Sequence, residues 1–418
     1  MDAESRRVVR EMMTRLGTWV KEIVADGRAT RNEAAARQLE ERIASEGQRH
    51  LARLLEGVLQ LAVDEGGGER RACPRCGRRR RHKGRQTRQP LSRLGPIRLT
   101  GVYWHCRHCG RGDHAAASLV GGTMTAWLEE LLTLLGTTQA SFAKASRVAD
   151  KLLGVTVEDE TVRRLCQRQG RRLMAAAPPP TPLPPETDLI GSCDGTMVHT
   201  RQRGWRELKS YLFSHAEGRF SGAYLESSQR FVPRLRRAAQ AVGAARARQL
   251  FFLSDAADWI DRGVRSQLPM AVRIIDLWHA CQHVHAAGDR LHGEGTAAAR
   301  RWGRLWTDRL RRWGGRRVLG RLEQWMATQR TSPGRRCRRA MKPLLTYLRR
   351  QQQRLDYPRY EAQGWPISSG PMESHCKQLG RRLKGPGMRW HTQNVDPMAA
   401  LVCLWTDDRW DNAWRIVA

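Results

Sequence analysis

The sequence predicts a multidomain α+β protein, and three observations lead to this fold class. Apolar residues recur at helical spacing in the first part of the chain, a stretch rich in cysteine, histidine and arginine follows, and short β-prone segments come after a run of prolines. A chain of 418 residues is long enough for two or three domains with cores of their own. We therefore expect helices, a cysteine-rich module and a strand-containing core, in that order.

The chain is strongly basic. It carries 74 Lys and Arg against 41 Asp and Glu, a formal net charge of +33, and only eight of the basic residues are lysines. A positive excess of this size goes beyond what solubility requires, and it favours a polyanion held through phosphate contacts and counterion release. Nucleic acid is the expected partner, with a membrane surface as the weaker alternative.

The sequence also bears on the compartment. No apolar run reaches the roughly 20 residues that span a bilayer, and residues 1–10 are charged and lack a secretory pattern. We expect a cytoplasmic protein with no membrane partner. Ten cysteines in a reducing compartment indicate metal binding or ordinary burial rather than a disulfide framework.

Changes in composition divide the chain into regions. The expected order is an N-terminal helical region (1–68), a cysteine-rich module (69–115), a second helical region (116–177), a proline-rich linker (178–187), the first part of an α/β core (188–278), a helical insertion (279–360) and a C-terminal helix with the end of the core (361–418). Gly66, Gly67 and Gly68 close the first region.

Two CxxC pairs, Cys73 with Cys76 and Cys106 with Cys109, predict a zinc ribbon. Each pair is followed directly by glycine, which permits the tight turn that aims two thiolates at one tetrahedral ion. Four cysteine ligands fill the coordination sphere, so the expected Zn²⁺ is a single structural ion. The segment between the pairs is somewhat longer than in common ribbons. The alternative interpretation is four free thiols without a metal.

Each CxxC pair with its glycine forms a turn that we call a knuckle, and basic residues directly follow the first one. A solvated charge run is one interpretation, but on a rigid zinc module we expect these side chains to contact DNA phosphates. They are Arg78, Arg79, Arg80, Arg81, Lys83 and Arg85. A strand is expected at residues 97–103.

Two helices after the ribbon are candidates for a helix-turn-helix. The first covers residues 139–153, with Phe142, Ala145, Val148, Ala149 and Leu152 inward, and ends at Gly154; the second is capped by Thr156 and runs to residue 172. Short helices joined by a short turn suit DNA binding, which would present Arg163 and Arg164, and an ordinary helical hairpin is the equal alternative.

Three acidic residues stand out in a chain short of acid. Asp194 and Asp255 lie within or at the end of apolar strand-like segments, and Glu373 lies in the first turn of a helix that Pro371 opens. Carboxylates placed in this way can hold two Mg²⁺ or Mn²⁺ ions. Each has a plainer interpretation: a hairpin turn at Asp194-Gly195, a helix cap at Asp255, and a favourable helix dipole at Glu373.

The helix of Glu373 continues with cations on one face. Lys377, Arg381 and Lys384 follow at helical spacing, which places positive charge beside the proposed metals, where a DNA backbone would run. Asp276 is the rival of Asp255 for the second ligand position, because it also follows a strand-like segment.

Two further clusters have plainer interpretations. The tryptophans at 302, 306, 313 and 325 are expected to form a core stripe rather than a base-stacking wedge. Cys281, His283 and His285 lie too close together on one helix for good tetrahedral geometry, so a second zinc site is not expected.

In these motifs, the chain resembles the bacterial insertion-sequence transposases of the ISKra type, which are related to Mutator-like transposases. The resemblance covers nearly the whole chain and rests on the two CxxC knuckles, Cys-Asp194-Gly-Thr, Ser-Asp255-Ala-Ala-Asp-Trp-Ile, Asp276-Leu-Trp-His279 and Gly370-Pro-Met-Glu373-Ser. One departure is Ala256, where glycine often follows the second aspartate.

The resemblance implies an RNase H-like core with a helical insertion before the last catalytic helix. It implies an acidic triad of Asp194, Asp255 and Glu373 holding two Mg²⁺ or Mn²⁺ ions, with Asp276 and His279 in support. The implied activity is cleavage and transfer of DNA strands at transposon ends and target DNA, by a homodimer or larger assembly associated with the bacterial nucleoid. A non-catalytic DNA-binding protein derived from a transposase, or a structure-specific nuclease, is the alternative.

Overall fold

The computed structural model describes residues 2–65, 72–176, 179–328 and 332–417. The chain forms two compact units, Met1–Arg168 and Gln169–Val417, and the boundary between them falls inside helix α5 (Asp159–Ala176). The expected glycine closure at 66–68 lies outside the described residues. Among the described helices, each is too short or too polar to cross a membrane.

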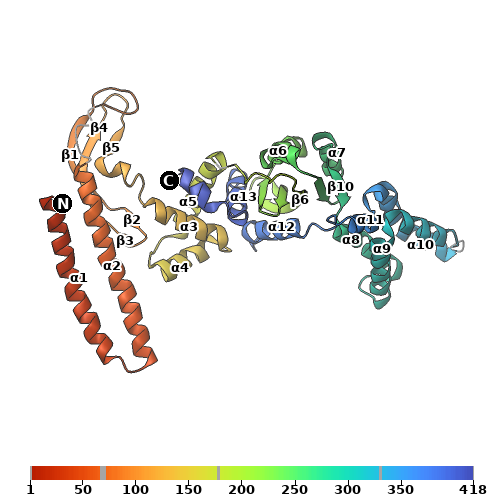
Figure 1. Ribbon diagram of the computed structural model, residues 1–418, viewed down its shortest axis with the longest axis horizontal. Coiled ribbons are helices and arrows are strands. Elements are labelled where there is room, and N and C mark those ends of the chain that lie inside the picture. The colour runs from red at the N-terminus through yellow and green to blue at the C-terminus, as the bar shows by residue number, and fades with distance from the viewer. Residues whose placement is uncertain (1, 66–71, 177–178, 329–331, 418) are drawn as a thin grey trace. The chain divides into compact units, whose positions relative to one another are not determined.

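The first unit begins with a long helical hairpin, as the apolar spacing predicted (Figure 1). Helix α1 (Ala3–Ala29) is capped by the Asp2 carboxylate, which accepts from the Ser5 N–H, and α2 (Glu33–Glu65) returns alongside it. Trp19 of α1 donates through its indole Nε1 to Glu46 of α2 at 2.9 Å. The hairpin therefore has a fixed register as well as an apolar contact.

The ribbon follows as a small antiparallel sheet in the order β1-β4-β5. Its strands are β1 (Arg81–Arg88), β4 (Leu99–His105) and β5 (Gly112–His114), with a two-stranded ladder of β2 (Leu91–Ser92) and β3 (Gly95–Pro96). The expected strand at 97–103 therefore lies about two residues later. Ile97, Leu99 and Val120 bury against Ala52 and Val63 of α2, next to the 3-10 turn Ala115–Ser118.

Three helices complete this unit: α3 (Ala126–Thr138), α4 (Phe142–Leu153) and the first half of α5. Ser141 caps α4 and Gly154 ends it with φ 62°. Two details of the prediction are wrong. Leu152 is 69% exposed, although it lies on the same side of α4 as the buried Ala145 and Ala149, because burial along this side ends before the last turn of the helix. Thr156 does not cap α5, because its hydroxyl donates to Asp150 at 2.6 Å and the helix begins only at Asp159.

The second unit is built on a mixed five-stranded sheet in the order β10-β9-β6-β7-β8. The strands are β6 (Leu189–Thr200), β7 (Gly204–His215), β8 (Gly218–Tyr224), β9 (Leu250–Ser254) and β10 (Val272–Ile275). The β-prone segments that the sequence places after the prolines, at residues 189–198, 209–214, 222–225, 249–253 and 271–275, all fall on these strands to within one residue. The first three form an antiparallel meander, and β9 and β10 run parallel to β6.

Alternate residues of strand β9 pack into two separate hydrophobic cores, one on each face of the sheet. Leu250 and Phe252 of β9 face one cluster, with α6 (Ser228–Val242), the 3-10 turn Ala244–Arg246 and α7 (Asp258–Gln267). Phe251 and Leu253 face the other, with the helical block that follows β10. This alternation is the period of two that a buried strand imposes.

The helical block comprises α8 (Leu277–His292), α9 (Ala297–Thr328), α10 (Ser332–Gln351), the 3-10 turn Gln352–Arg354 and α11 (Tyr357–Ala362). Helix α9 kinks at Gly314, whose φ of 74° is accessible to glycine. Trp306 is buried in the core of this block, and Trp302, Trp313 and Trp325 pack against it. The expectation of a tryptophan core stripe is confirmed.

The chain ends with α12 (Gly370–Leu383), α13 (Thr392–Thr406) and α14 (Trp410–Val417). The carboxylate of Asp407, just after α13, accepts from the N–H and hydroxyl of Ser221 in β8. The proline-rich segment packs on the same unit: Leu183 is buried and its N–H donates to Val242 at 3.0 Å. The break between compact units thus precedes this segment.

Candidate functional site

The two CxxC turns are equivalent knuckles in the ribbon. In each turn, the N–H of the first cysteine donates to the carbonyl oxygen of the residue five positions later. The distances are 2.8 Å from Cys73 to Arg78 and 2.9 Å from Cys106 to Arg111. The following glycines, Gly77 and Gly110, have φ of 70° and 69°, a conformation that favours glycine. The glycine in each motif is therefore explained by the turn.

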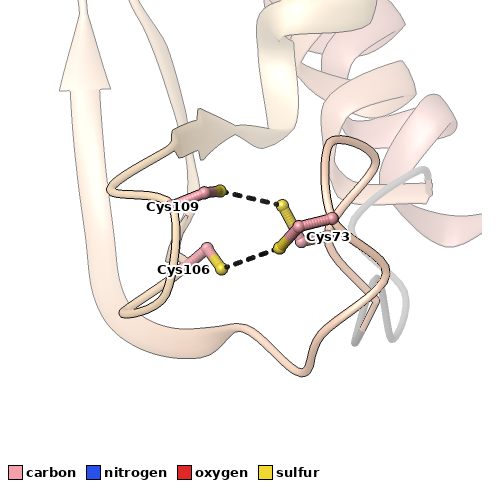
Figure 2. Close-up of side chains that lie close together, drawn as sticks. Cys73, Cys106 and Cys109 are labelled. Carbon is pink, nitrogen blue, oxygen red and sulfur yellow. Dashed lines mark hydrogen bonds between the residues drawn. The ribbon is translucent and has the colours of Figure 1, made fainter.

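Figure 2 shows the thiols of Cys73, Cys106 and Cys109 turned toward one space between the knuckles. The sulfur atoms of Cys73 and Cys109 are 3.6 Å apart, as are those of Cys76 and Cys106. All four lie within 4.8 Å of one another. Zinc–sulfur bonds of about 2.3 Å in a tetrahedron require sulfurs ~3.8 Å apart, so the four cysteines are arranged as a zinc site.

The protein also prepares these thiols for a metal. The backbone N–H of Arg75 lowers the pKa of Cys73 to about 6, and that of Cys109 lowers the pKa of Cys106. The pKa of Cys76 rises to about 11, although the N–H of Arg78 opposes the rise, because burial and its hydrogen bonds with the other cysteine thiols hold its proton. Thiolate is the form that binds zinc, and the backbone N–H groups inside the knuckles favour it.

The arginines beside the first knuckle separate into two groups. Arg78, Arg79, Arg81, Lys83 and Arg85 are exposed. Arg80 is 4% exposed and forms an ion pair with Asp113 of β5 at 2.8 Å. The prediction that Arg80 contacts phosphate is therefore wrong, because a buried guanidinium held by a carboxylate ties the knuckle to the sheet instead.

Several of the exposed or half-exposed cations have acidic partners of their own. Arg85 contacts Asp64 of α2 at 2.8 Å. Arg163 and Arg164 of α5 both bind Glu160, at 2.5 and 2.7 Å. Exposed pairs of this kind are weak enough to exchange for a phosphate.

A second site lies in the other unit, where a pocket of about 140 Å³ collects the acidic residues. Asp194 comes from β6, Asp255 from the end of β9, Asp276 from the end of β10 and Glu373 from the first turn of α12. The carboxyl ends of parallel strands β9 and β10 share an edge, which is why two of these acids are neighbours. The structure thus brings together all four acidic residues that the sequence singled out, with His279 beside them.

Asp194 lies inside a strand and not in a turn. It is paired with Ser210 in the β6–β7 ladder, and the hairpin turn comes at residues 201–203. Burial raises the pKa of its carboxyl, and the charge of Asp255 raises it further, against the Gly195 N–H and His279. The hairpin-turn alternative for Asp194-Gly195 is therefore wrong.

Asp255 and Asp276 differ in how their oxygens are used. Asp255 accepts one hydrogen bond, from the Ala257 N–H at 3.0 Å, and it does not cap α7. Asp276 is buried and caps α8: one oxygen accepts from the His279 N–H at 3.1 Å and the other from the Ser369 N–H. The free oxygen belongs to Asp255, and Asp276 fixes the loop before α12.

Glu373 is exposed at the rim of the pocket. Its carboxylate binds Lys377, one helical turn on, at 2.9 Å. Lys377, Arg381 and Lys384 are all exposed, although Lys384 lies just beyond the last residue of α12. The first cation of the expected stripe, Lys377, therefore forms an ion pair with Glu373 itself.

The ligand atoms of the four cysteines lie within 4.8 Å of one another. Among the described residues, the carboxylates of the pocket do not form a group of that compactness. Like charges repel, and each carboxylate is satisfied locally by a backbone N–H or by Lys377. The pocket is therefore an arrangement of separate carboxylates facing one space. Among the described residues, Cys281, His283 and His285 form no such group either, and the His283 ring stacks on Tyr347.

Sequence reasoning missed several residues of this site. Cys376, one turn after Glu373, contacts the Ser210 hydroxyl at 3.6 Å, and burial followed by the charge of Asp194 raises its pKa to about 12. It docks α12 onto the β6–β7 ladder, and its spacing of three from Glu373 was the available signal. Ser254, Gln282, Ser368 and Ser369 also line the pocket, without a sequence pattern to mark them.

No protein-family model matches this sequence, and no curated protein matches it.

Proposed function

We propose that the chain is a DNA transposase that cuts DNA at transposon ends and joins them to target DNA. The observation that carries the proposal is the pocket in which Asp194, Asp255 and Glu373 meet from three elements far apart in the sequence. A protein that only binds DNA has no need for such a pocket.

The sheet supports an RNase H-like core for this unit. In that fold, an antiparallel meander of three strands is extended beside its first strand by two strands parallel to it, which is the order β10-β9-β6-β7-β8 found here. A helical block, α8 to α11, separates the last strand from the acidic helix α12. This order of elements fits a core with a helical insertion before its last catalytic helix.

The donor set of the pocket suits hard divalent cations. Asp194, Asp255 and Glu373 offer oxygen atoms, and Mg²⁺ or Mn²⁺ is held in proteins by few carboxylates together with substrate phosphate. The unfavourable burial of the Asp194 charge beside Asp255 is what a cation would relieve. When bound, two such ions activate water or a 3′-hydroxyl and stabilise the leaving oxygen.

The remaining residues hold the acids in place. Asp276 ties the N-terminus of α8 to the loop that precedes Glu373, so it is a positioning residue rather than a metal ligand. Lys377 neutralises Glu373 until a cation replaces it, and then becomes available for a DNA phosphate. Trp278 and His279 border the same pocket, where DNA would enter.

The first unit is assigned to recognition of the DNA ends. Its ribbon is stabilised by one structural zinc on the four cysteines, and the exposed cations Arg78, Arg79, Arg81, Lys83 and Arg85 surround the first knuckle. Arg163 and Arg164 of α5 add a second basic surface. Two ends must be joined, so a homodimer or larger assembly on DNA is part of the proposal.

The test uses a supercoiled plasmid carrying the genomic segment that surrounds the coding sequence, with Mg²⁺ or Mn²⁺. Wild type is expected to cut and rejoin DNA, and Asp194→Asn, Asp255→Asn and Glu373→Gln each to lose at least about 100-fold in rate, because losing only an outer-shell partner of a metal ligand already costs about 10–100-fold. Asp258→Asn is the matched control, because Asp258 lies three residues after Asp255 but is exposed and paired with Arg350.

The outcomes separate the candidate functions. Cutting without joining indicates a nuclease, and binding without cutting indicates a non-catalytic DNA-binding protein. If the three variants cut as fast as Asp258→Asn, the assignment of the triad is wrong.

A further inference from the structure

The α1–α2 hairpin exposes a row of large apolar side chains. On α1 these are Val9, Met13, Val20 and Val24, and on α2 they are Ile43, Leu51, Leu54 and Val58. Their exposed fractions run from 37% at Leu54 to 67% at Met13. Patches of this kind on a folded protein mark an interaction surface.

The side chains of each helix lie on one stripe. At 3.6 residues per turn, the four residues of α1 fall within about 60° of one another and those of α2 within about 80°. We call the two stripes together the apolar face. It runs along about 22 Å of α1, since Val9 and Val24 are fifteen residues apart.

The apolar face lies to one side of the contacts between the two helices. These contacts join Val8 to Gly57 and Gly27 to Leu39, and the Trp19 ring also reaches Gly47 on the stripe of α2. The ribbon covers another side of α2, at Leu59 and Val63. A polar cleft of about 440 Å³, lined by Thr14, Arg15, Glu46 and Arg49 among others, occupies the opposite side of the hairpin.

The two stripes lie level with each other. Because the helices are antiparallel, counting from the crossing of Trp19 with Gly47 brings Val9 level with Val58, Met13 with Leu54 and Val24 with Ile43. Each match holds to within two residues, about 3 Å along the axis. The face therefore contains three layers with one side chain from either helix, and Val20 and Leu51 lie between these layers.

We propose that the hairpin packs face to face with the same hairpin of a second copy of this chain, forming a four-helix bundle. A two-fold axis parallel to the helices places α1 over α2 of the other copy and keeps every residue at its own level. Each layer then contains four side chains, such as Met13 and Leu54 from both copies. This is the layered core of an antiparallel bundle.

The size of the face suits a dimer. Burying a whole aliphatic side chain removes on the order of 100 Å² of apolar surface. Eight side chains about half exposed thus offer roughly 400 Å² per copy. A standard interface buries ~800 Å² per partner, of which roughly 500 Å² is apolar, so the face is nearly sufficient with its polar border.

The charges at the border favour a second copy over another partner. Beside the stripe of α1 lie the exposed residues Arg6, Arg10, Lys21 and Arg28, whereas the stripe of α2 continues at its two ends into the exposed residues Glu33, Glu40 and Glu65. Face-to-face packing brings the basic side of α1 in one copy beside the acidic ends of the α2 stripe in the other, with Arg28 and Glu40 at nearly the same level. An apolar face does not suit DNA, which the basic surfaces elsewhere would hold.

The test measures the mass of the full chain in solution without DNA, by sedimentation, so its result does not depend on the proposed strand transfer. Wild type is expected to be dimeric at micromolar concentration. Met13→Lys and Leu54→Glu should each raise the dimer dissociation constant at least 100-fold, because each buries two unpaired charges in the bundle. Leu152→Glu is the control, since Leu152 is 69% exposed on α4 and belongs to neither stripe.

Mixing the two variants gives the decisive result. A heterodimer sets the introduced lysine of one chain beside the introduced glutamate of the other in one layer, and retains Met13 with Leu54 as the remaining pair of that layer, so mixing should restore the dimer. A monomeric wild type, variants that stay dimeric, or a mixture that stays monomeric would overturn the proposal. A monomer whose face becomes protease-sensitive only in the variants would mean that the chain's own second unit covers it. Circular dichroism checks that each variant is folded.

Discussion

The carboxylate of Asp276 accepts a hydrogen bond from the backbone N–H of Ser369, a residue 93 positions further along the chain. Its other oxygen accepts from the His279 N–H at 3.1 Å. One buried side chain thus joins the end of β10, the start of α8 and the loop that leads into α12. The position of Glu373 depends on this link, across the whole helical block.

Asp276→Asn should therefore act on stability. An amide offers one acceptor and one NH2 group, so one of the two backbone N–H donors is left facing a donor. A buried unsatisfied donor costs about 1–3 kcal/mol, and we expect the free energy of unfolding to fall by that amount in urea denaturation. Asp258→Asn, at an exposed carboxylate, should change it by less than about 0.5 kcal/mol. Equal stability of the two variants would show that Asp276 does not hold the loop.

Purified protein should contain about one zinc per chain, bound by the four cysteines. Metal analysis of a Cys73→Ser, Cys106→Ser double variant should show its loss, whereas Cys337→Ser, at a cysteine of α10 outside the group, should retain it. Because thiolate is the ligand, protons compete with zinc for the sulfur atoms, and retention should fall as the pH is lowered. Zinc that remains in the double variant would place the ion elsewhere.

Lys377→Gln should free the Glu373 carboxylate from its ion pair. An exposed pair of this kind is worth about 0.2–1 kcal/mol, so the Mg²⁺ concentration for half-maximal cleavage should fall by up to about fivefold. Lys384→Gln removes a charge from the same exposed stripe without touching Glu373, and should leave that concentration unchanged. If both variants shift the Mg²⁺ requirement alike, the effect comes from the general charge of the helix.

The sequence predicted the five strands of the core and the two knuckles because both have local signatures. Strand β1 was missed: Arg81–Arg88 is almost wholly polar and lacks the apolar alternation of a half-buried strand, and it forms by pairing with β4. Leu152 was misplaced because apolar spacing shows which side of a helix is buried but not where along the helix that burial ends. The spacing of Cys376 from Glu373 could have marked that residue, but its partner Ser210 and the partner of Asp276, Ser369, have no local signature, since tertiary packing alone brings them together.

Asp407 should make stability depend on pH. Burial raises the pKa of its carboxyl from 3.8 to about 6, although the hydrogen bonds from Ser221 and the charge of Arg409 act in the opposite direction. The folded protein binds this proton more tightly than the unfolded chain. The stability it contributes is therefore fully present below about pH 4 and is lost as the pH rises through about 6.

Asp407→Asn should remove that dependence. The amide can still accept from the Ser221 N–H and donate to its hydroxyl, but it carries no charge to bury. At pH 7 the variant should be more stable than wild type, by roughly 2–3 kcal/mol at most, and at pH 4 the two should match in urea titrations. Asp408→Asn, at the exposed neighbour, should follow the wild-type curve. A variant that is less stable at both pH values would show that the carboxylate is needed in its charged form.

Gly170 should be required for the packing of α5 on α13. A Cβ at this position would lie 2.5 Å from the carbonyl oxygen of Pro397, which is backbone and cannot move aside cheaply. Gly170→Ala should therefore destabilise the second unit by about 1–3 kcal/mol, measured as the free energy of unfolding. Gly380→Ala is the matched control: it lies within α12, its Cβ would meet nothing within 4 Å, and alanine there should stabilise the helix by about 0.5–1 kcal/mol. Opposite signs for the two changes are expected, because one glycine is kept for a close approach and the other is not. A Gly170→Ala protein as stable as wild type would mean that α13 can shift, and that the hydrogen bond from Arg171 to Asn394, at 2.9 Å, is not fixed by the close contact beside it.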